Sequence, residues 1–534
     1  MTRIMTGAAL ALGAIAITVP AKAQDKRTSV TPFIEISQVL TGDTNTKDVL
    51  TYSQVSVGID GQTSTRRFEA QISYRFDQRI DWQKHVGVDQ VHSGLARVAL
   101  KVTPILQIEG GALATRARTD IRGATANPLS GSGTNLSQIY SSYVGPTLTA
   151  QEGPFGIAAS YRFGATRVDA PTSRGLAAGS APIDTYSKST SQLAQASIGA
   201  KAGQFLPFGV SVSGAWQKEN AGQLDQKYED KFGRADVVMP IAPTLAVVAG
   251  AGYEDIKITQ KDPVLDGTGK PITDSHGHFY ASASAAPRIA YDTTGLFYDA
   301  GVVWRPSSRT TLQVRAGRRY DTMSYTGSFS HQTGNGSGFQ VGVYDSIQSF
   351  GRQLRDGVAA LPTNFTVDNG ALGQGYSGCT FGTGDGAAGG CLNSAFQSIT
   401  SNNYRARGVD GVFVLVRGPN TFGLGGGYAN RRYIAPQATG AALNVDGMVD
   451  QSFYAQLTYA RQLSRTASFN ASLYGNYANP GAPGAQDVVT AGGIASLSQR
   501  FGRLGVFGSL GAYYIDGDDS NVAGQAQAGM RYQF

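Results

Sequence analysis

Hydrophobic and polar side chains alternate along several stretches of this chain. Between Arg67 and Asp77, every second residue is apolar, from Phe68 to Phe76. The same period of two recurs over residues 155–164, 453–459, 469–477 and 526–534. A helix would require a period near 3.6 residues. The pattern therefore predicts β-strands that each have one apolar and one polar face.

The predicted strands are long. The alternating segments span about nine to twelve residues, whereas strands of soluble proteins most often have about five or six. A tilted strand of about 9–11 residues crosses the apolar core of a bilayer. Aromatic residues stand near the strand ends, as they do at membrane interfaces; they include Tyr52, Tyr74, Trp216, Trp304 and Tyr428. The competing interpretation is a soluble β-sandwich. A sandwich of 534 residues would divide into domains, and no linker divides this chain.

Connections of alternating length join the predicted strands. Short turns are predicted at Asp60-Gly61, Gly153-Pro154, 306–308, 418–420 and 502–503, among others. Longer polar connections are predicted at 118–137, 166–189, 259–294, 346–403 and 435–450. Short turns on one side and long loops on the other are typical of bacterial outer-membrane barrels.

The fold class expected is therefore all-β. It consists of a single large antiparallel transmembrane β-barrel of about 22 strands, within a range of roughly 18 to 24. The barrel must close, because each unpaired peptide group costs several kcal/mol in lipid. We expect short periplasmic turns, long extracellular loops, both termini on the short-turn side, and a location in the cell outer membrane.

Composition and the first residues support export. Mean hydropathy is −0.17, and no run of 18 apolar residues follows residue 25, which disfavours a helical membrane protein. A basic start, an apolar stretch over Gly7–Val19 and a small-x-small site at Ala21–Ala23 predict a cleavable signal peptide over 1–23, with the barrel over 24–534. The competing interpretation is a single N-terminal anchor. The mature chain would keep 43 basic and 38 acidic residues, scattered along the sequence, so no nucleic-acid partner is expected.

Basic side chains outnumber acidic ones on the polar faces of the predicted strands. Where those faces point into a lumen, the basic residues that line it are Arg75, Arg97, Lys101, Arg162, Arg315 and Arg319. Rings of Arg and Lys in a pore favour anions. The competing interpretation is a ladder of arginines paired with carboxylates on neighbouring strands, which would hold the barrel in shape without selectivity.

Two cysteines, Cys379 and Cys391, lie on either side of a Gly-rich run. Two cysteines in an exported chain usually pair, so a disulfide is predicted. The surrounding segment, 346–403, is too long for an idle loop. Its flanks carry apolar residues at helical spacing, namely Ile347, Phe350, Leu354 and Val358, then Leu392, Ala395, Phe396 and Ile399. Two short helices could cap the barrel mouth or fold into the lumen, and the sequence leaves both open.

The C-terminal residues resemble those of bacterial outer-membrane barrels. Such chains commonly end in an aromatic residue preceded by apolar residues at alternating positions, as at Met530, Tyr532 and Phe534. The resemblance implies that the barrel-assembly machinery reads this ending and that outer-membrane lipid surrounds the barrel. Residues 301–320 (GVVWRPSSRTTLQVRAGRRY), with 343–355 and 391–408, carry a narrower resemblance to a poorly characterised family of Gram-negative outer-membrane β-barrels.

The resemblance to that family indicates the topology of the chain well and its activity poorly. Some members are similar to barrels associated with exopolysaccharide export. Others carry a preprotein-translocase-subunit label, which this sequence does not support, because that subunit is a short, single-span inner-membrane protein.

No catalytic, metal or cofactor site is predicted, and an enzyme is not expected. The sequence lacks G-x-S-x-G and H-E-x-x-H motifs. Asp274, His276 and His278 lie together in a long predicted loop, but they are too few to indicate a metal site. Two functions remain. The first is a porin-like channel or export pore for small polar or anionic solutes or acidic polysaccharide, working with periplasmic export partners. The alternative is a non-conducting structural barrel whose own loops plug its lumen.

Overall fold

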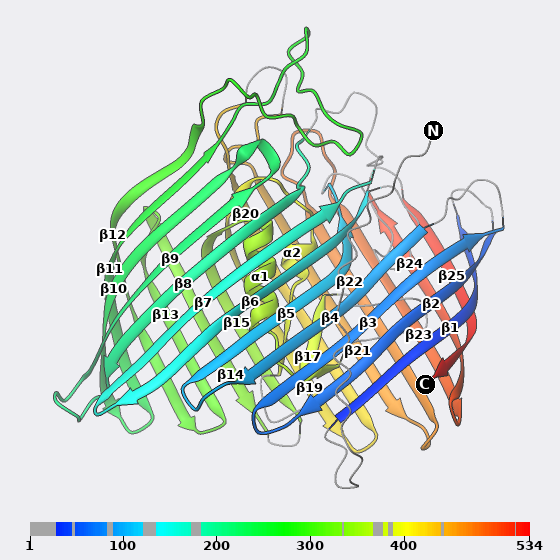
Figure 1. Cartoon of the computed structure of the whole chain (residues 1–534), viewed down its shortest axis with the longest axis horizontal. Coiled ribbons are helices and arrows are strands. Elements are labelled where there is room, and N and C mark those ends of the chain that lie inside the picture. Colours follow the sequence, from blue (N-terminus) through cyan, green and yellow to red (C-terminus); the bar gives the residue numbers. More distant parts are fainter. Residues whose placement is uncertain are drawn as a thin grey trace.

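One antiparallel sheet of 22 strands closes on itself (Figure 1). The first strand, β1 (Thr28–Asp43), pairs with β2 (Val49–Ser64) on one side and with the last strand, β25 (Asn521–Gln533), on the other. The predicted all-β barrel of about 22 strands is thereby confirmed. The computed structural model describes residues 28–44, 49–82, 89–120, 135–171, 183–333, 336–366, 378–382, 388–438, 443–517 and 520–534. The predicted signal peptide, 1–23, lies outside these ranges.

The remaining barrel strands follow one another around the wall in chain order. They are β3 (Phe68–Asp81), β4 (Asp89–Lys101), β5 (Leu106–Arg118), β6 (Leu136–Glu152), β7 (Phe155–Asp169), β8 (Lys188–Ala200), β9 (Gly209–Ala221), β10 (Lys227–Ala242), β11 (Leu245–Gln260), β12 (Arg288–Ser307), β13 (Thr310–Arg319), β14 (Thr322–Gln332), β15 (Gly338–Gln348), β19 (Asn403–Arg417), β20 (Asn420–Ile434), β21 (Val449–Gln462), β22 (Ala467–Asn479), β23 (Val488–Phe501) and β24 (Leu504–Asp516). A single 3-10 turn, η1 (Gln223–Asp225), separates β9 from β10.

Short turns gather at one end of the barrel and longer connections at the other, as predicted (Figure 1). Strand β1 begins and strand β25 ends at the short-turn end, where the Phe534 amide donates to the Pro32 carbonyl at 3.0 Å. One predicted turn is wrong, because Asp60-Gly61 lies inside β2 and the chain turns at 65–67 instead. At the long-loop end, β13 and β14 are joined by only two residues. These are Tyr320 and Asp321, with φ of 54° and 58°, the left-handed pair that a tight hairpin requires.

The segment between β15 and β19 folds separately from the wall. It contains α1 (Phe350–Ala360), a small sheet of β16 (Phe365–Thr366), β17 (Cys379–Gly382) and β18 (Gly389–Cys391), and α2 (Asn393–Phe396). The helices predicted from apolar spacing are therefore present, although Ile347 belongs to β15 and Ile399 follows α2. We call the described residues 349–366, 378–382 and 388–402 the inner segment. No helix in the described part of the chain is long and apolar enough to span a membrane.

Candidate functional site

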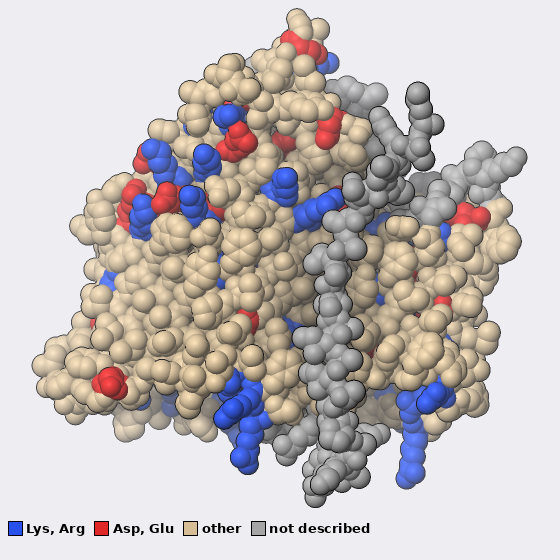
Figure 2. Space-filling view, in the orientation of Figure 1, with Lys and Arg blue, Asp and Glu red and all other residues tan. Residues whose placement is uncertain are grey.

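The outer surface of the barrel is apolar. Side chains that point outward remain exposed despite being large and hydrophobic, with Leu296 80% and Leu510 69% exposed. Figure 2 shows charged residues gathered towards the long-loop end and at the short-turn rim, with a broad belt almost free of charge between them. A closed sheet satisfies its own backbone groups, and such a belt is stable only in lipid. Antiparallel barrels of this construction span outer membranes, so the chain is an outer-membrane β-barrel.

The inner segment lies inside the lumen and not over its mouth. Helix α1 contacts the wall at β5, β6, β7 and β8. Its apolar stripe of Phe350, Leu354 and Val358 is fully buried against inward-facing residues. Those wall residues are Leu95, Leu113, Ala117, Ile139, Tyr143 and Val168. This part of the wall therefore carries an apolar inner face, which a water-filled lumen alone would not require.

The wall supplies a charge of the right sign to each end of α1. At the N-terminus, the Ser349 hydroxyl accepts from the Arg352 amide at 3.2 Å and donates to the Glu219 carboxylate of β9. At the C-terminus, Arg97 of β4 donates to the carbonyls of Ala359 at 3.1 Å and Leu361 at 3.2 Å. A helix end with free N–H groups favours an anion, and one with free carbonyls favours a cation. The barrel thus fixes both the position and the direction of the helix.

Arg352 anchors α1 from within the lumen. Its side chain is completely buried, with Nε 3.0 Å from a Glu219 oxygen and a terminal nitrogen 2.9 Å from Oδ1 of Asn403. The guanidinium also lies over the Tyr228 ring, 3.4 Å from its centroid. A buried charge is stable only when it is paired and hydrogen-bonded. Burial opposes ionisation of Arg352, but Tyr228 and Glu219 outweigh it and raise the pKa of the guanidinium.

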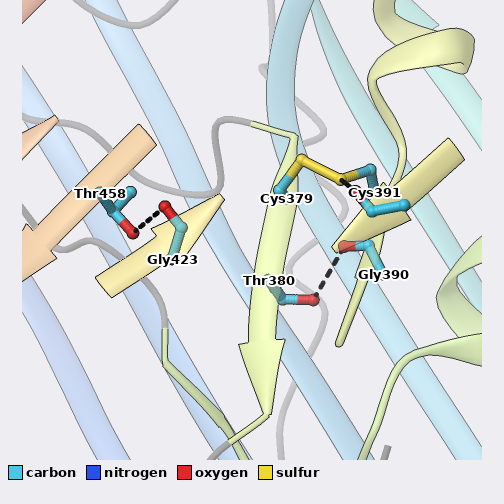
Figure 3. The surroundings of a disulfide bond; sticks show 7 residues. Cys379, Thr380, Gly390, Cys391, Gly423 and Thr458 are labelled. Carbon is cyan, nitrogen blue, oxygen red and sulfur yellow. Dashed lines mark hydrogen bonds between the residues drawn. A yellow bond between two sulfur atoms is a disulfide. The ribbon is translucent and has the colours of Figure 1, made fainter. Parts of the chain in front are cut away.

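The predicted disulfide is present between Cys379 and Cys391. It joins β17 to β18, where the two cysteines are also backbone partners (Figure 3). The small sheet packs on β19, with Phe381 against Val412 and Val414. A Cβ at Gly425 of β20 would lie 2.6 Å from the Cys379 sulfur, so glycine leaves room for the disulfide against the wall.

Further hydrogen bonds join the end of the inner segment to the wall. Arg431 of β20 pairs with Asp450 of β21 at 2.5 Å and donates to Ser398 at 2.7 and 3.2 Å. Arg118 of β5 donates to the Gln397 carbonyl at 2.9 Å. The inner segment is therefore tied to opposite sides of the barrel.

Of the predicted lumen residues, Arg75, Arg315 and Arg319 point inward and pair with carboxylates. Arg75 lies 2.6 Å from both Glu35 and Asp77 and is 2% exposed. Arg319 pairs with Glu254. Arg315 and Arg234 share two carboxylates, since each lies within 3.0 Å of Asp236 and Asp299; these four residues form the arginine–aspartate square. Their charges are largely balanced in place.

The other predicted residues differ from this group. Arg97 binds the carbonyls of α1. Lys101 is exposed at the short-turn end of β4, and Arg162 is half-buried on β7. Within the described residues, neither Lys101 nor Arg162 has an ion pair, and Nε of Arg162 has no hydrogen-bond partner.

The wall from β21 to β25 encloses a polar cavity at the short-turn end. Its volume is about 540 Å³. It is lined by Gln462, Arg465, Thr466, Ser468, Asn470, Ser496, Ser498, Gln499, Arg500, Gly505, Val506, Phe507, Arg531 and Gln533. The apolar cluster around α1 lies on a different stretch of wall, β4–β7, which strands β1–β3 separate from the cavity wall. The lumen is thus divided into a packed part and a polar part.

Sequence reasoning missed several of these residues. Glu219, Arg352, Arg431 and Arg500 were not singled out, because each is one charged residue among many in an alternating pattern. Arg352 and Glu219, for example, lie 133 residues apart in the chain, and no local signal marks their pairing. The cavity itself arises from five neighbouring strands, and only the Ser- and Gln-rich inward positions of β22–β25 hint at it.

The remaining predicted residues lie at the barrel surface. Met530, Tyr532 and Phe534 face outward and are 55%, 41% and 60% exposed. In the loop after β11, Asp274 accepts from the backbone of His276 and His278 at 2.8 and 2.9 Å. Partial burial opposes ionisation of Asp274, but its hydrogen bonds outweigh this and lower the pKa of the carboxyl. Over the ranges described, no group of three or more His, Cys, Asp and Glu side chains could hold a metal ion.

No family model and no curated protein matches the chain. Among solved structures, it is similar to the siderophore receptor PirA of Pseudomonas aeruginosa, with 9% identity over 96% of this chain and 81% of that one and a TM-score of 0.39. It is similar to OccAB4 of Acinetobacter baumannii, with 9% identity over 96% and 99% of the two chains and a TM-score of 0.32. It is also similar to the ferric-catecholate import receptor Fiu of E. coli K12, with 9% identity over 93% of this chain and 81% of that one and a TM-score of 0.43. Similarities this low carry no argument about function.

Proposed function

We propose that this protein is a porin-like channel of the outer membrane for small polar and anionic solutes. The supporting observation is the division of the lumen. The inner segment packs against apolar wall residues on one side, whereas the wall from β21 to β25 leaves a polar cavity of about 540 Å³. Barrels of 16–18 strands leave an aqueous channel, and barrels of 22 strands are wide enough to hold a plug. Export of an acidic polysaccharide along the same polar wall is the second form of this proposal.

The charge of the polar part favours anions. The cavity lining includes three arginines, Arg465, Arg500 and Arg531, and no Asp or Glu among its described residues. Arg531 is paired with Glu35, which leaves two of the three arginines unbalanced. The paired arginines, by contrast, contribute little net field, because Arg75 and the arginine–aspartate square are balanced by carboxylates. Unbalanced basic groups in a narrow pore raise the local anion concentration.

Single-channel recording of the folded mature protein in a planar bilayer under a KCl gradient tests the proposal. We expect discrete conductance steps and a reversal potential that favours chloride. The comparison variant replaces residues 350–399 with a short Gly/Ser linker and should conduct more.

Three results are informative. If the wild-type protein conducts with chloride preference, the proposal stands. If only the linker variant conducts, the protein is the alternative, a structural barrel plugged by its own inner segment. If folded protein conducts but prefers potassium, the pore is open and the anionic substrate class is wrong.

A further inference from the structure

The polar cavity at the short-turn end has a defined arrangement of charge. Arg500 of β23 and Arg531 of β25 are both cross-strand partners of Gly505, which lies between them on β24. All three positions face the lumen. Since neighbouring strands lie about 4.8 Å apart, the two arginine Cα atoms are separated by about 10 Å. Glycine puts no side chain into that gap, and a Cβ there would meet only carbonyl oxygens at 3.7 and 3.9 Å.

The arginines of this cavity are held differently. Arg531 is fixed by the Glu35 carboxylate at 2.8 Å and lies over the Phe33 ring at 4.2 Å. Arg500 and Arg465 are exposed, and in the described structure neither has a carboxylate partner. The Arg500 amide donates to the Thr466 carbonyl at 2.8 Å, so the backbone brings strand β23 against the turn that carries Arg465. Two unbalanced guanidinium groups therefore border one cavity.

The rest of the lining is hydroxyl, amide and aromatic. The Ser468 and Ser498 hydroxyls lie 2.7 Å apart across β22 and β23. Asn470 and Gln533 add amides. Phe507 also lines the cavity. The tip of its ring lies 2.6 Å from the point that a Cβ of Gly529 would occupy. Such a set can hold a ligand that has several hydroxyls, one apolar face and one anionic group.

We propose that this cavity binds a carboxylated, hydroxyl-rich solute of the uronic-acid type. Arg500 and Arg465 bind the carboxylate, the serine and amide side chains bind the hydroxyls, and Phe507 packs against the apolar face of the sugar ring. A neutral sugar lacks the group that pairs with the guanidinium groups. This inference deepens the proposed channel function and rests on it for its place in transport, because the cavity lies at the short-turn mouth of the same lumen.

Isothermal titration calorimetry of the full mature protein in detergent micelles tests the site separately from conduction. Galacturonate is the anionic probe, and galactose is its neutral counterpart. We expect galacturonate to bind at least about tenfold more tightly than galactose. Arg500→Gln combined with Arg465→Gln should weaken galacturonate binding at least about tenfold, since charge-assisted hydrogen bonds are lost. Arg503→Gln is the matched control, because Arg503 lies in the same rim of turns but outside the cavity, and its binding should equal wild type.

Each outcome decides the inference. Equal affinity for the two sugars, no galacturonate binding, or equal loss in the Arg503 variant overturns it. Folding of every variant is verified by circular dichroism; all three arginines are exposed, so the barrel should form. A protein that conducts but fails to bind galacturonate loses this site and keeps the channel function. A protein that binds galacturonate but does not conduct keeps the site and loses the channel function.

Discussion

At the scale of single residues, the arginines of the lumen have three different environments. Arg97 caps a helix, Arg315 is balanced by two aspartates, and Arg500 borders open space. In the sequence, all three occupy the same kind of position, a basic residue on the polar face of a strand. Their difference arises from what lies opposite them across the lumen. The field of this pore is consequently set by a few unbalanced arginines and not by the number of basic residues.

Arg97→Ala should loosen the inner segment. The substitution removes two hydrogen bonds and the cation at the C-terminus of α1, which together contribute about 2 kcal/mol. We expect the population of channels with a displaced inner segment, seen in single-channel recordings as a larger conductance level, to rise by about 30-fold. Lys101→Ala is the control, because Lys101 lies on the same strand and face but at the exposed end. If both variants behave as wild type, Arg97 does not hold the helix in place.

Arg315→Ala should destabilise the barrel. It leaves the Asp236 and Asp299 carboxylates with Arg234 as their one remaining partner in the square. Removing one partner from a largely buried charge network costs about 2 kcal/mol or more. The measurement is the temperature at which the folded form is lost on semi-native gels, which should fall. Arg318→Ala, on the exposed face of the same strand, should leave that temperature unchanged, and an equal fall in both variants would contradict the role of the square.

At the scale of elements, the sequence predicted the wall well and the interior poorly. Period-two alternation follows directly from a wall with lipid on one side and a lumen on the other, so strands such as β3 and β7 could be recognised from their own residues. The error at Asp60-Gly61 shows the limit of turn signals. Asp60 lies opposite Ser73, and Gly61 lies opposite Ile72, within the β2–β3 ladder. Turn residues inside a long strand are tolerated when the neighbouring strand holds them in register.

The candidate site was predicted in its parts but not in its arrangement. Helical spacing around Leu354 and the pair of cysteines both indicated structure within 346–403. Whether that structure capped the mouth or entered the lumen depended on the apolar inner face at Leu113 and Ile139. An alternating pattern with apolar residues on both faces is ambiguous in sequence, because it also fits a weakly patterned strand. Contacts between elements far apart in the chain resolved it.

The disulfide should stabilise the inner segment and leave the barrel unaffected. Its 12-residue separation corresponds to about 3 kcal/mol of lost chain entropy in the unfolded segment. We expect a Cys379→Ser, Cys391→Ser double variant to insert normally but to expose the inner segment to added protease in folded protein. Heat stability of the barrel on semi-native gels should equal wild type. Equal protease resistance with and without the disulfide would show that wall contacts alone hold the segment.

At the scale of the whole molecule, closure depends on the seam between the first and last strands. The β1–β25 ladder extends from Phe33↔Gln533 to Asp43↔Ala523. These are the first and last strands of the chain, and almost the whole sequence lies between them. They can therefore pair only when the rest of the chain is present. Every other barrel strand pairs with a neighbour in the sequence, within a local hairpin or across a loop. The seam is therefore the step at which an open sheet, with two unsatisfied edges in lipid, becomes a barrel.

The last residue should matter more for forming this seam than for the stability of the closed barrel. Phe534 faces lipid, its ring lies 5.1 Å from that of Tyr532, and its amide completes the ladder at Pro32. We expect removal of Phe534 to lower the amount of folded protein in outer membranes several-fold, because the resemblance to barrel endings implies that the assembly machinery reads this residue. The material that does fold should melt close to wild type, since one hydrogen bond contributes only about 1 kcal/mol. Val522→Ala, at the other end of the same strand and face, should leave the folded amount unchanged. Unchanged yield without Phe534 would place the assembly signal elsewhere in β25, whereas reduced yield together with a much lower melting temperature would make the residue a structural clasp and not a signal.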